Sequence, residues 1–338
     1  MKCNLCQHSR QSAAPRVTGV RHVRQSGGVT TSTAACHNLA SPACNGWNGR
    51  GFSAIGSSIM NGPPQVFDRA LYLARQACAS GEAQALLETR VVDELLDRLS
   101  VINRGFETGL LIGQRTDSAR VALIEGGKCA RVETLMPSAS DNLALPMGAY
   151  QLVVSLLDLH AVNDVPGYMA QVAAALVPDG LAIFAFFAGD TLRQLREAWL
   201  IAEQQVTGGA SPRVAPMIDL RETGGLLQRA GLALPVADVD RLPLRYADAF
   251  ALMREIKSLG FSNCLVGRSH SATSRRLLLA AAEAYTKNFA EADGRIPATV
   301  DIAWAMAWKP HPSQQKPLKP GSAKARLADA LKVSEEKL

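Results

Sequence analysis

The spacing of apolar residues changes at Pro64, where a pattern typical of amphipathic helices begins. Apolar side chains recur three and four positions apart as far as Leu99, so the pattern predicts two helices within residues 60–105. A short apolar run from Phe106 to Gly113 follows and ends in a glycine turn, which is typical of a buried strand. We therefore expect helices first and the start of a sheet near residue 106.

Three apolar segments in the middle of the chain have the pattern of a β-α-β unit. Residues 151–157 form a continuous run of β-type residues, and residues 168–176 have one apolar face at helical spacing. Residues 178–180 predict a turn, and residues 181–187 predict another buried strand. Because parallel strands are joined by crossover helices, this order predicts an α/β domain with a parallel sheet covered on both faces.

The remaining pattern predicts elements that complete this domain and add a helical lobe. They are a helix from Asp117 or Ser118 to Glu125, a strand at 130–135, a helix from the caps Asp190 and Thr191 to Val206, a helix at 220–229, two short strands joined by a turn in 234–244, and helices at 247–259 and 274–289. Only about 38 residues separate Gly113 from Gln151, which is short for two helix-and-strand units. One sheet element is therefore expected to be shortened or missing.

The composition is that of a folded globular protein, because 47% of the 338 residues are hydrophobic and 20% are charged. The formal net charge of +6 comes mainly from the two ends of the chain, so we expect no nucleic-acid partner. The longest apolar segment, Leu181 to Ala188, has the length of a strand, so we expect no transmembrane segment.

The two ends of the chain differ from its middle. Residues 1–59 contain no Asp or Glu, and their arginines lie among Ser, Gly, Thr and Ala. Organellar transit peptides have this composition; the alternative is that Met60 is the true start and residues 1–59 are a mis-annotated, disordered extension. Four cysteines in this stretch lack the spacing of a zinc site, so no metal is expected. Residues 309–338 form a proline-broken basic tail.

The strand that ends near Gly113 leads into the candidate cofactor loop. In open α/β sheets, ligands bind at the carboxyl ends of the strands, where glycines let backbone N–H groups approach them closely. Gly113 fits that role, but Arg115 stands where a second glycine is expected, and its side chain would occupy the space of the ligand. Glu133, near the end of the next predicted strand, is the candidate ribose contact; the alternative is a solvated surface acid.

Several separate motifs occur in the order found in one known family. They are Pro63–Arg69, Ser155–Pro166, Pro178–Leu181, Gly189–Arg196, Gly208–Pro216, Gly224–Gly231, Asp293–Thr299 and Trp308–Ala323. On these motifs the chain resembles the methyltransferase-like family of complex I (NADH:ubiquinone oxidoreductase) assembly factor 5, in particular its alphaproteobacterial members, with an altered cofactor loop. The resemblance covers about residues 64–335.

The resemblance implies the Rossmann-like fold of class I methyltransferases, enzymes that use S-adenosylmethionine (SAM), together with a largely helical C-terminal lobe. We accordingly expect N-terminal helices at 60–105, the methyltransferase-like domain at 106–235, the lobe at 236–308 and the tail at 309–338. The resemblance also implies SAM as cofactor and a role in modifying or chaperoning a protein subunit during complex I assembly. Members of the family are associated with methyl transfer or with hydroxylation of a protein arginine, so the fold alone does not decide the reaction.

The motifs also supply candidate site residues at the ligand edge of the sheet. His160 and Asp164 follow the strand at 151–157 and are the candidate catalytic residues; the alternatives are a structural histidine and a helix cap. The candidate cofactor contacts are Gly113, Arg115, Glu133, Ser155 and Asp158, and the candidate substrate contacts are Asp190, Thr191 and Arg193. Arg193 also fits the description of a solvated charge on a helix.

Two other functions fit the sequence. The altered loop fits a catalytically inactive binding module that keeps the methyltransferase fold. The fold also fits a small-molecule O-methyltransferase such as the malonyl-carrier type, although that function does not explain the C-terminal motifs. The expected partner is a protein, and the expected compartment is the cytoplasm of a bacterium or the mitochondrial matrix of a eukaryote.

Overall fold

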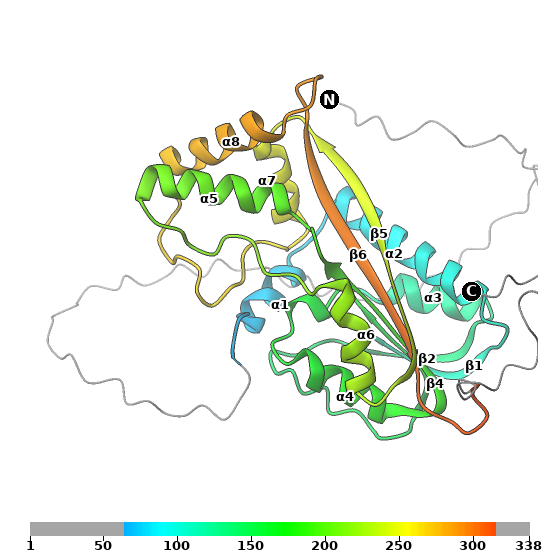
Figure 1. The fold of residues 1–338 in the computed structure, drawn as a ribbon. Helices are drawn as coiled ribbons and strands as arrows, with labels where there is room; N and C mark the ends of the chain where they lie inside the picture. Colours follow the sequence, from blue (N-terminus) through cyan, green and yellow to red (C-terminus); the bar gives the residue numbers. More distant parts are fainter. Residues whose placement is uncertain (1–63, 316–338) are drawn as a thin grey trace, which may run out of the picture. The chain divides into compact units, whose positions relative to one another are not determined.

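A computed structural model describes residues 64–315 of the chain, which Figure 1 shows coloured along the sequence. Its elements are α1 (Arg69–Ala77), α2 (Glu82–Ser100), β1 (Phe106–Ile112), α3 (Asp117–Glu125), β2 (Cys129–Leu135), β3 (Tyr150–Leu156), η1 (Leu159–Ala161), α4 (Val165–Ala175), β4 (Leu176–Ala188), α5 (Arg193–Thr207), α6 (Leu220–Arg229), β5 (Ala233–Tyr246), α7 (Ala249–Ser258), α8 (Arg275–Phe289) and β6 (Ile296–Trp308). The expectations for residues 1–59, for the start at Met60 and for the tail beyond residue 315 lie outside the described residues.

The strands of the described residues form one sheet in the order β2-β1-β3-β4-β6-β5. Strands β1 to β4 run parallel to one another, whereas β6 runs antiparallel to both of its neighbours, β4 and β5. Helix α4 connects β3 to β4, so the expected β-α-β unit and its parallel sheet are confirmed. The protein has the expected class I methyltransferase-type α/β fold.

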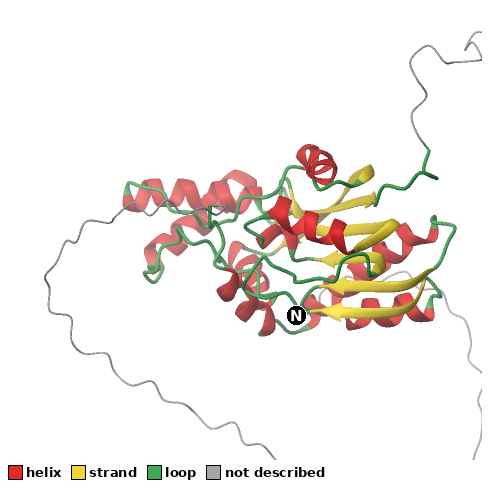
Figure 2. Ribbon diagram, turned by 90° about the horizontal axis from the view of Figure 1, so that it is seen from below, coloured by secondary structure: helices red, strands yellow, loops and turns green. Residues whose placement is uncertain are grey.

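Helices cover both faces of the sheet because successive residues of a strand point to opposite faces. Phe184 and Phe186 of β4 pack with α4 and α6 on one face. Ile183 and Ala185 of the same strand pack with α2 and α3 on the other face. All four side chains are fully buried, and Figure 2 shows the strands lying between the helices. The two faces of the sheet therefore form the main core.

The connection between β2 and β3 contains no helix or strand within residues 136–149. As a result, β2 is an edge strand of the sheet and pairs with β1 alone. The expectation that a sheet element is shortened or missing between Gly113 and Gln151 is confirmed, since no strand or helix lies between β2 and β3. The chain crosses from one edge of the parallel sheet to its centre through a loop that contains Asp141.

Several local expectations were wrong. Residues 234–244 lie in one continuous strand, β5, rather than in two strands joined by a turn. Residues 178–180 form an irregular stretch within β4, because Leu176 pairs with Tyr150 whereas Leu181 pairs with Leu152. The central residues of this stretch are still turn-like, since Asp179 has a left-handed φ of 62°. No strand had been expected at 296–308, where β6 completes the sheet.

Two expected helix caps were also wrong. The N-cap of α3 is Thr116, which makes no side-chain capping bond, rather than Asp117 or Ser118. The N-cap of α5 is Leu192, and the hydroxyl of Thr191 instead donates to the carbonyls of Ala188 and Asp301 at 2.8 and 3.1 Å. Thr191 therefore ties the end of β4 to β6 instead of capping the helix.

Helices α5, α7 and α8 pack together beyond the carboxyl end of β4 and form a helical lobe. The lobe shares its core with the first residues of β6, including Ile296 and Ala298. Because β5 and β6 pair along almost their whole length, they connect this lobe to the main sheet. The expected domain boundary at residues 235 and 236 stays a prediction; it would fall inside β5.

No helix among residues 64–315 is long and apolar enough to cross a membrane. The same residues contain no group of three or more His, Cys, Asp and Glu side chains that could hold a metal ion.

Candidate functional site

The carboxyl ends of β1, β3 and β4 meet at one edge of the sheet, the place where ligands bind in folds of this class. Helix α1 lies over this edge, and the hydroxyl of Tyr72 donates to the carbonyl of Leu157, just after β3, at 2.8 Å. The loop after α7 lies beside it, since Gln76 donates to the carbonyl of Leu259 at 3.2 Å. The edge is therefore covered by the first helix and by the loop after α7.

A buried ion pair lies at the centre of this edge. The two terminal nitrogens of Arg69, on α1, donate to the two carboxylate oxygens of Asp158 at 2.9 and 3.0 Å. The exposed fraction is 3% for the Arg69 side chain and 2% for that of Asp158. Burial raises the pKa of Asp158 above its ordinary value, and the Arg69 guanidinium opposes this shift. The two-pronged contact stabilises the charged forms of both side chains against the loss of hydration.

A second carboxylate flanks the ion pair. Asp141 lies with one oxygen 3.6 Å from Nε of Arg69, and its other oxygen accepts bonds from the backbone N–H groups of Asn163 and Asp164, both at 3.0 Å. The 3.6 Å separation is too long for a hydrogen bond. Nε of Arg69 and the facing oxygen of Asp141 are both buried without a hydrogen-bond partner among the described residues.

His160 lies beside the ion pair in an aromatic enclosure. Its Nε2 is 3.4 Å from the Tyr72 hydroxyl, and its ring makes edge contacts with Phe187 and Phe261. Burial, with a smaller contribution from the Arg69 charge, lowers the pKa of His160 to about 3. Its Nδ1 is buried and has no hydrogen-bond partner in the described part of the chain. A neutral imidazole in this environment is a weak base, so it is suited to hydrogen bonding and to positioning its neighbours rather than to accepting a proton.

Ser155 does not reach the open side of the sheet. Its hydroxyl lies 3.0 Å from that of Tyr168, on α4, and both residues are fully buried. Asp164 accepts a bond from the backbone N–H of Gly167 at 2.9 Å and is the N-cap of α4. Asp164 therefore makes the contact expected of a helix cap. The cofactor role of Ser155 and the catalytic role of Asp164 stay predictions.

Gly113 lies where the turn after β1 passes close to β3. A side chain at this position would place its first carbon 2.9 Å from the carbonyl oxygen of Leu156 and 3.3 Å from a methyl group of Thr116. The backbone N–H of Gly113 donates to the carbonyl of Leu135 at 3.1 Å and so extends the pairing of β1 with β2. This glycine is required by the close approach of protein backbone, and its N–H group is already used.

Arg115 crosses the candidate cofactor space toward the N-terminal helices. Its guanidinium donates to the carbonyls of Gln76, in the last turn of α1, at 3.3 Å, and of Ala79, just beyond that helix. It also lies 3.5 Å from a carboxylate oxygen of Glu88, on α2. The predicted obstruction by this side chain is thus accompanied by a second effect, since Arg115 fastens α1 and α2 to the turn after β1.

The space left at this edge is too small for SAM. A cavity of about 40 Å³ lies among α1, α2, the turn after β1 and Phe261, whereas cofactor-sized ligands occupy pockets of roughly 300 to 1,000 Å³. Gly113 and Arg115 both face backbone or helix partners rather than an open cradle. In this arrangement the residues present do not fit the cofactor that the fold implies.

Glu133 makes a contact that the sequence did not suggest. Its carboxylate accepts a bond from the hydroxyl of Tyr150, at the amino end of β3, at 2.8 Å. This contact raises the pKa of Tyr150 to about 12, together with burial, which is the larger cause. Glu133 pairs with Leu110 in the middle of β1 rather than at its end, so its contact points away from the ligand edge. Its ribose-binding role stays a prediction.

The candidate substrate residues lie at the end of β4, near the helical lobe. Asp190 is half-exposed and lies 3.3 Å from Arg241, which also binds the buried Asp301 at 2.8 Å. Arg193 is exposed and pairs with Glu197, one turn along α5, at 3.2 Å. Arg193 therefore has the contact of a solvated helix charge. Neither Asp190 nor Arg193 contacts the Arg69–Asp158 pair.

Sequence reasoning missed four members of the buried cluster. Arg69, Tyr72, Asp141 and Tyr168 come from α1, the loop before β3 and α4, and they surround Asp158 and His160. One signal was present, because the motif Pro63–Arg69 carries a charged residue just where α1 begins. The partner of that charge lies 89 residues away along the chain, which no local pattern reveals.

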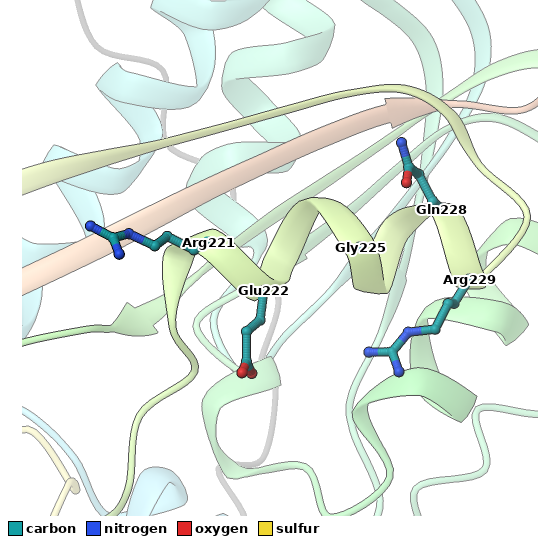
Figure 3. Close-up of a pocket in the computed structure, with 5 residues that line it drawn as sticks. All are labelled: Arg221, Glu222, Gly225, Gln228 and Arg229. Atoms are coloured by element: carbon teal, nitrogen blue, oxygen red, sulfur yellow. The ribbon is translucent and has the colours of Figure 1, made fainter.

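A second hollow lies on the outer side of α6 and does not form an enclosed site. Its lining residues all belong to that helix, and Figure 3 shows their side chains diverging along it. They are Arg221, Glu222, Gly225, Gln228 and Arg229. Because a single helix lines it, this hollow is open surface.

No family model matches the chain. Two proteins named arginine-hydroxylase NDUFAF5, mitochondrial, are similar to it along most of its length. The one from Rattus norvegicus is 32% identical over 328 residues, which cover 88% of this chain and 94% of the relative. The one from Homo sapiens is 32% identical over 291 residues, which cover 80% of this chain and 84% of the relative.

A malonyl-[acyl-carrier protein] O-methyltransferase of Laribacter hongkongensis is 29% identical over 276 residues, covering 73% of this chain and 90% of the relative. Among solved structures, phosphoethanolamine N-methyltransferase 2 of Haemonchus contortus matches with a TM-score of 0.37 and 10% identity, over 66% of this chain and 53% of that one.

Proposed function

The chain belongs to the family of the arginine-hydroxylase NDUFAF5, and from this premise we propose that it is a methyltransferase-fold assembly factor that acts on a protein subunit of respiratory complex I. The observation that carries the proposal is identity of 32% to the rat relative along 88% of the chain. The order of family motifs from Pro63 to Ala323 supports the same role. In a eukaryotic cell this role belongs in the mitochondrial matrix, and in a bacterium in the cytoplasm.

Because the ligand edge of the sheet is closed, we infer that the chain acts by first binding its protein partner. Arg115 fastens α1 over the turn after β1, and the remaining cavity of about 40 Å³ is too small for SAM. What the edge does hold is a buried ionic cluster, Arg69 with Asp158, beside a neutral His160.

A small-molecule O-methyltransferase is less well supported. The malonyl-carrier relative is 29% identical over 73% of this chain, a lower identity and coverage than those of the rat and human relatives. Such an enzyme would also need SAM and an open acceptor pocket, and the edge of the sheet offers neither in this arrangement.

The assembly role is tested by deleting the gene in the organism that carries this chain. We expect a loss of mature complex I on native gels and of its NADH:quinone activity, both restored by the full chain supplied in trans. Succinate:quinone activity serves as the control for general respiratory damage. Normal complex I in the deletion strain would overturn the proposal.

The cofactor question is tested by calorimetric titration of the full chain with SAM and S-adenosylhomocysteine. We expect no binding by the wild-type chain at micromolar concentrations, because Arg115 and α1 fill the edge. Arg115→Gly removes that side chain and its bonds to α1, and Arg193→Ala removes an exposed charge as the matched control. Micromolar binding by the wild-type chain would show that the edge opens and that the cofactor is used.

A further inference from the structure

The sheet has two edges, and they differ in how readily a further strand can pair with them. The outer strand at one edge, β5, contains Pro235 and Pro243, and its register with β6 shifts between Ala233 and Val236. Proline has no N–H group to donate, and a shift in register bends a strand, so both features disfavour the addition of a further strand. The edge at β5 is therefore unsuited to pairing.

The strand at the other edge, β2, has neither of these features. Its sequence, Cys129–Leu135, contains no proline, and its register with β1 is regular from Arg131 to Leu135. No strand within residues 64–315 pairs with its outer side. Unpaired strand edges are templates for pairing with another chain. The strand β2 is thus the edge of the sheet that can accept a further strand.

The backbone bonds of β2 show which of its residues face outward. The carbonyl of Leu135 accepts a bond from the N–H of Gly113, just after β1, at 3.1 Å. Because the backbone groups of successive strand residues alternate in direction, every second residue back to Arg131 also directs its N–H and carbonyl toward β1. Val132 and Thr134 therefore direct theirs outward. These two residues offer backbone donors and acceptors to a further strand.

The side chains on either side of Val132 have opposite charges. Arg131 and Glu133 are exposed and, being two residues apart, lie on one face of the strand. Val132 is the central residue of β2. When two copies of the strand run antiparallel with Val132 opposite Val132, each Arg131 lies opposite Glu133 of the other copy. In that register these side chains form a pair without backbone hydrogen bonds between them, the type in which opposing side chains are closest.

The existing contact of Glu133 is compatible with this pairing. One of its carboxylate oxygens accepts a bond from the Tyr150 hydroxyl at 2.8 Å, and the other has no hydrogen-bond partner among residues 64–315. A carboxylate can accept bonds at both of its oxygens. The second oxygen can therefore accept from the guanidinium of an opposing Arg131, so that β2 is complementary to itself in both backbone and charge.

Helix α3 adds an apolar surface beside this edge. It packs on the sheet next to β2, since Leu123 of the helix belongs to the core cluster against which Val132 is packed. Val121 and Ile124, three residues apart on the helix, have exposed fractions of 41% and 40%. A two-fold axis perpendicular to the sheet places the α3 helices of two copies on the same face of the joined sheet. Exposed apolar side chains in that position suit the buried part of an interface.

We propose that two copies of this chain associate by antiparallel pairing of their β2 strands about Val132, which joins two six-stranded sheets into one. The edge itself specifies a second copy as its occupant, because a two-fold contact uses the same surface on both sides and pairs both of its charges. Since the joined strands run antiparallel, the two ligand edges lie at opposite ends of the joined sheet. The pairing therefore covers neither ligand edge, and it goes beyond the assembly role without depending on it.

Sedimentation equilibrium of the full chain tests for the association. Over a concentration range from about 0.1 to about 100 μM, we expect the average mass to rise toward twice the chain mass of 36.0 kDa. A mass that stays at 36.0 kDa over this range overturns the proposal, including the case in which another segment of the same chain covers the edge.

Charge reversal tests the register. Arg131→Glu places like charges opposite each other, so the dissociation constant of the dimer should rise at least about tenfold, and Glu133→Arg should do the same. The double variant restores opposite charges and should return the constant to within about threefold of the wild-type value. Arg221→Glu, at an exposed position of α6, is the control and should leave the constant unchanged. Dimerisation that is insensitive to both single reversals overturns the proposal.

Hydrogen exchange of the wild-type chain gives a measurement that needs no substitution. As the concentration rises through the dissociation constant, exchange of the Val132 amide, which is directed outward, should slow at least about tenfold. The Glu133 amide is directed toward β1 in both states and should change far less. A dimer in which the Val132 amide exchanges at its monomer rate is held together by another surface, and that result also overturns the proposal.

Discussion

Among single residues, His160 is the one whose chemistry depends most on its surroundings. The groups that face it are Arg69 and Tyr72 from α1, Phe187 from β4 and Phe261 from the loop after α7. The neighbouring cation and the lack of water both disfavour the imidazolium, so the ring is neutral over the physiological range. The structural role expected for this histidine is compatible with a neutral ring; its catalytic role stays a prediction.

The neutral state of His160 predicts a pH dependence of stability. Its pKa is about 3 in the folded chain and about 6.5 in an unfolded chain, so on acidification the unfolded chain binds the proton first. The stabilisation is fully present above about pH 6.5 and falls by up to about 1.4 kcal/mol per pH unit below it. Asp158 acts in the opposite sense, because its folded pKa is raised, so the measurement stays above pH 5, where carboxyl groups titrate less.

The measurement is urea unfolding of the wild-type chain and of His160→Gln at about pH 7 and about pH 5. We expect the wild-type free energy of unfolding to fall more than that of the variant, by about 1 to 2 kcal/mol over this interval. An imidazole resonance of His160 that titrates near pH 6.5 would contradict the buried, neutral assignment.

Local sequence patterns identified residues better than they identified residue partners. Asp158 and His160 were selected because they follow a predicted strand, and the structure places both in the buried cluster at the ligand edge. Arg69 and Asp141 were missed because their contacts with Asp158 and with each other depend on segments brought together only by folding. Glu133 was selected for its position near the end of a predicted strand, yet its carboxylate points toward the Tyr150 hydroxyl.

Among the elements, the turn after β1 shows why one glycine was retained. The loop packs directly on the end of β3, so a methyl group at Gly113 would lie 2.9 Å from the Leu156 carbonyl oxygen. Backbone on both sides of this contact belongs to paired strands and cannot move freely. The same turn carries Arg115, whose contacts attach α1 and α2 to the end of β1.

The turn after β1 predicts opposite effects for two glycine substitutions. Gly113→Ala should lower the free energy of unfolding by about 1 to 3 kcal/mol, because the new methyl group overpacks the contact with Leu156. Gly225→Ala is the matched control: it lies on α6 with no atom within 4 Å of the added carbon, so it should stabilise the chain by up to about 1 kcal/mol. Guanidinium unfolding measures both, and equal effects would contradict the packing argument.

The parallel strands β1, β3 and β4 were predicted well from the sequence, whereas the antiparallel strands β5 and β6 were not. The runs at β1, β3 and β4 are continuous and apolar because these strands are covered on both faces. Prolines and charges inside 234–244 suggested a break, but β5 is an edge strand, where prolines are tolerated. The alanine-rich run Ala303 to Ala307 in β6 lacks β-branched residues, so its strand depends on pairing with β4 and β5.

Considered as a whole, the described unit is held together by β6. Its first residues, including Ile296, pack into the helical lobe, and its central residues, including Trp304, are buried in the main core. The guanidinium of Arg98, on α2, lies 4.5 Å above the Trp304 ring. Helix α2, which covers one face of the sheet, therefore also contacts β6. Since one strand contributes to two cores, neither core retains its full packing when the other unfolds.

This shared strand predicts a single cooperative unfolding transition for the sheet and the lobe. The chain has four tryptophans, of which Trp199 lies in the core of the lobe and Trp304 in the main core. The fluorescence of a variant that keeps Trp199 alone and that of one that keeps Trp304 alone, with Phe at the other three positions, should follow the same denaturant midpoint as the helical circular dichroism, after correction for each variant's stability. Trp304→Ala should lower the free energy of unfolding by about 3 to 5 kcal/mol and move the lobe signal together with the sheet signal. If the lobe signal instead kept its wild-type midpoint in Trp304→Ala, β6 would not couple the two cores, and a partner bound at the ligand edge would have no route through this strand to the lobe.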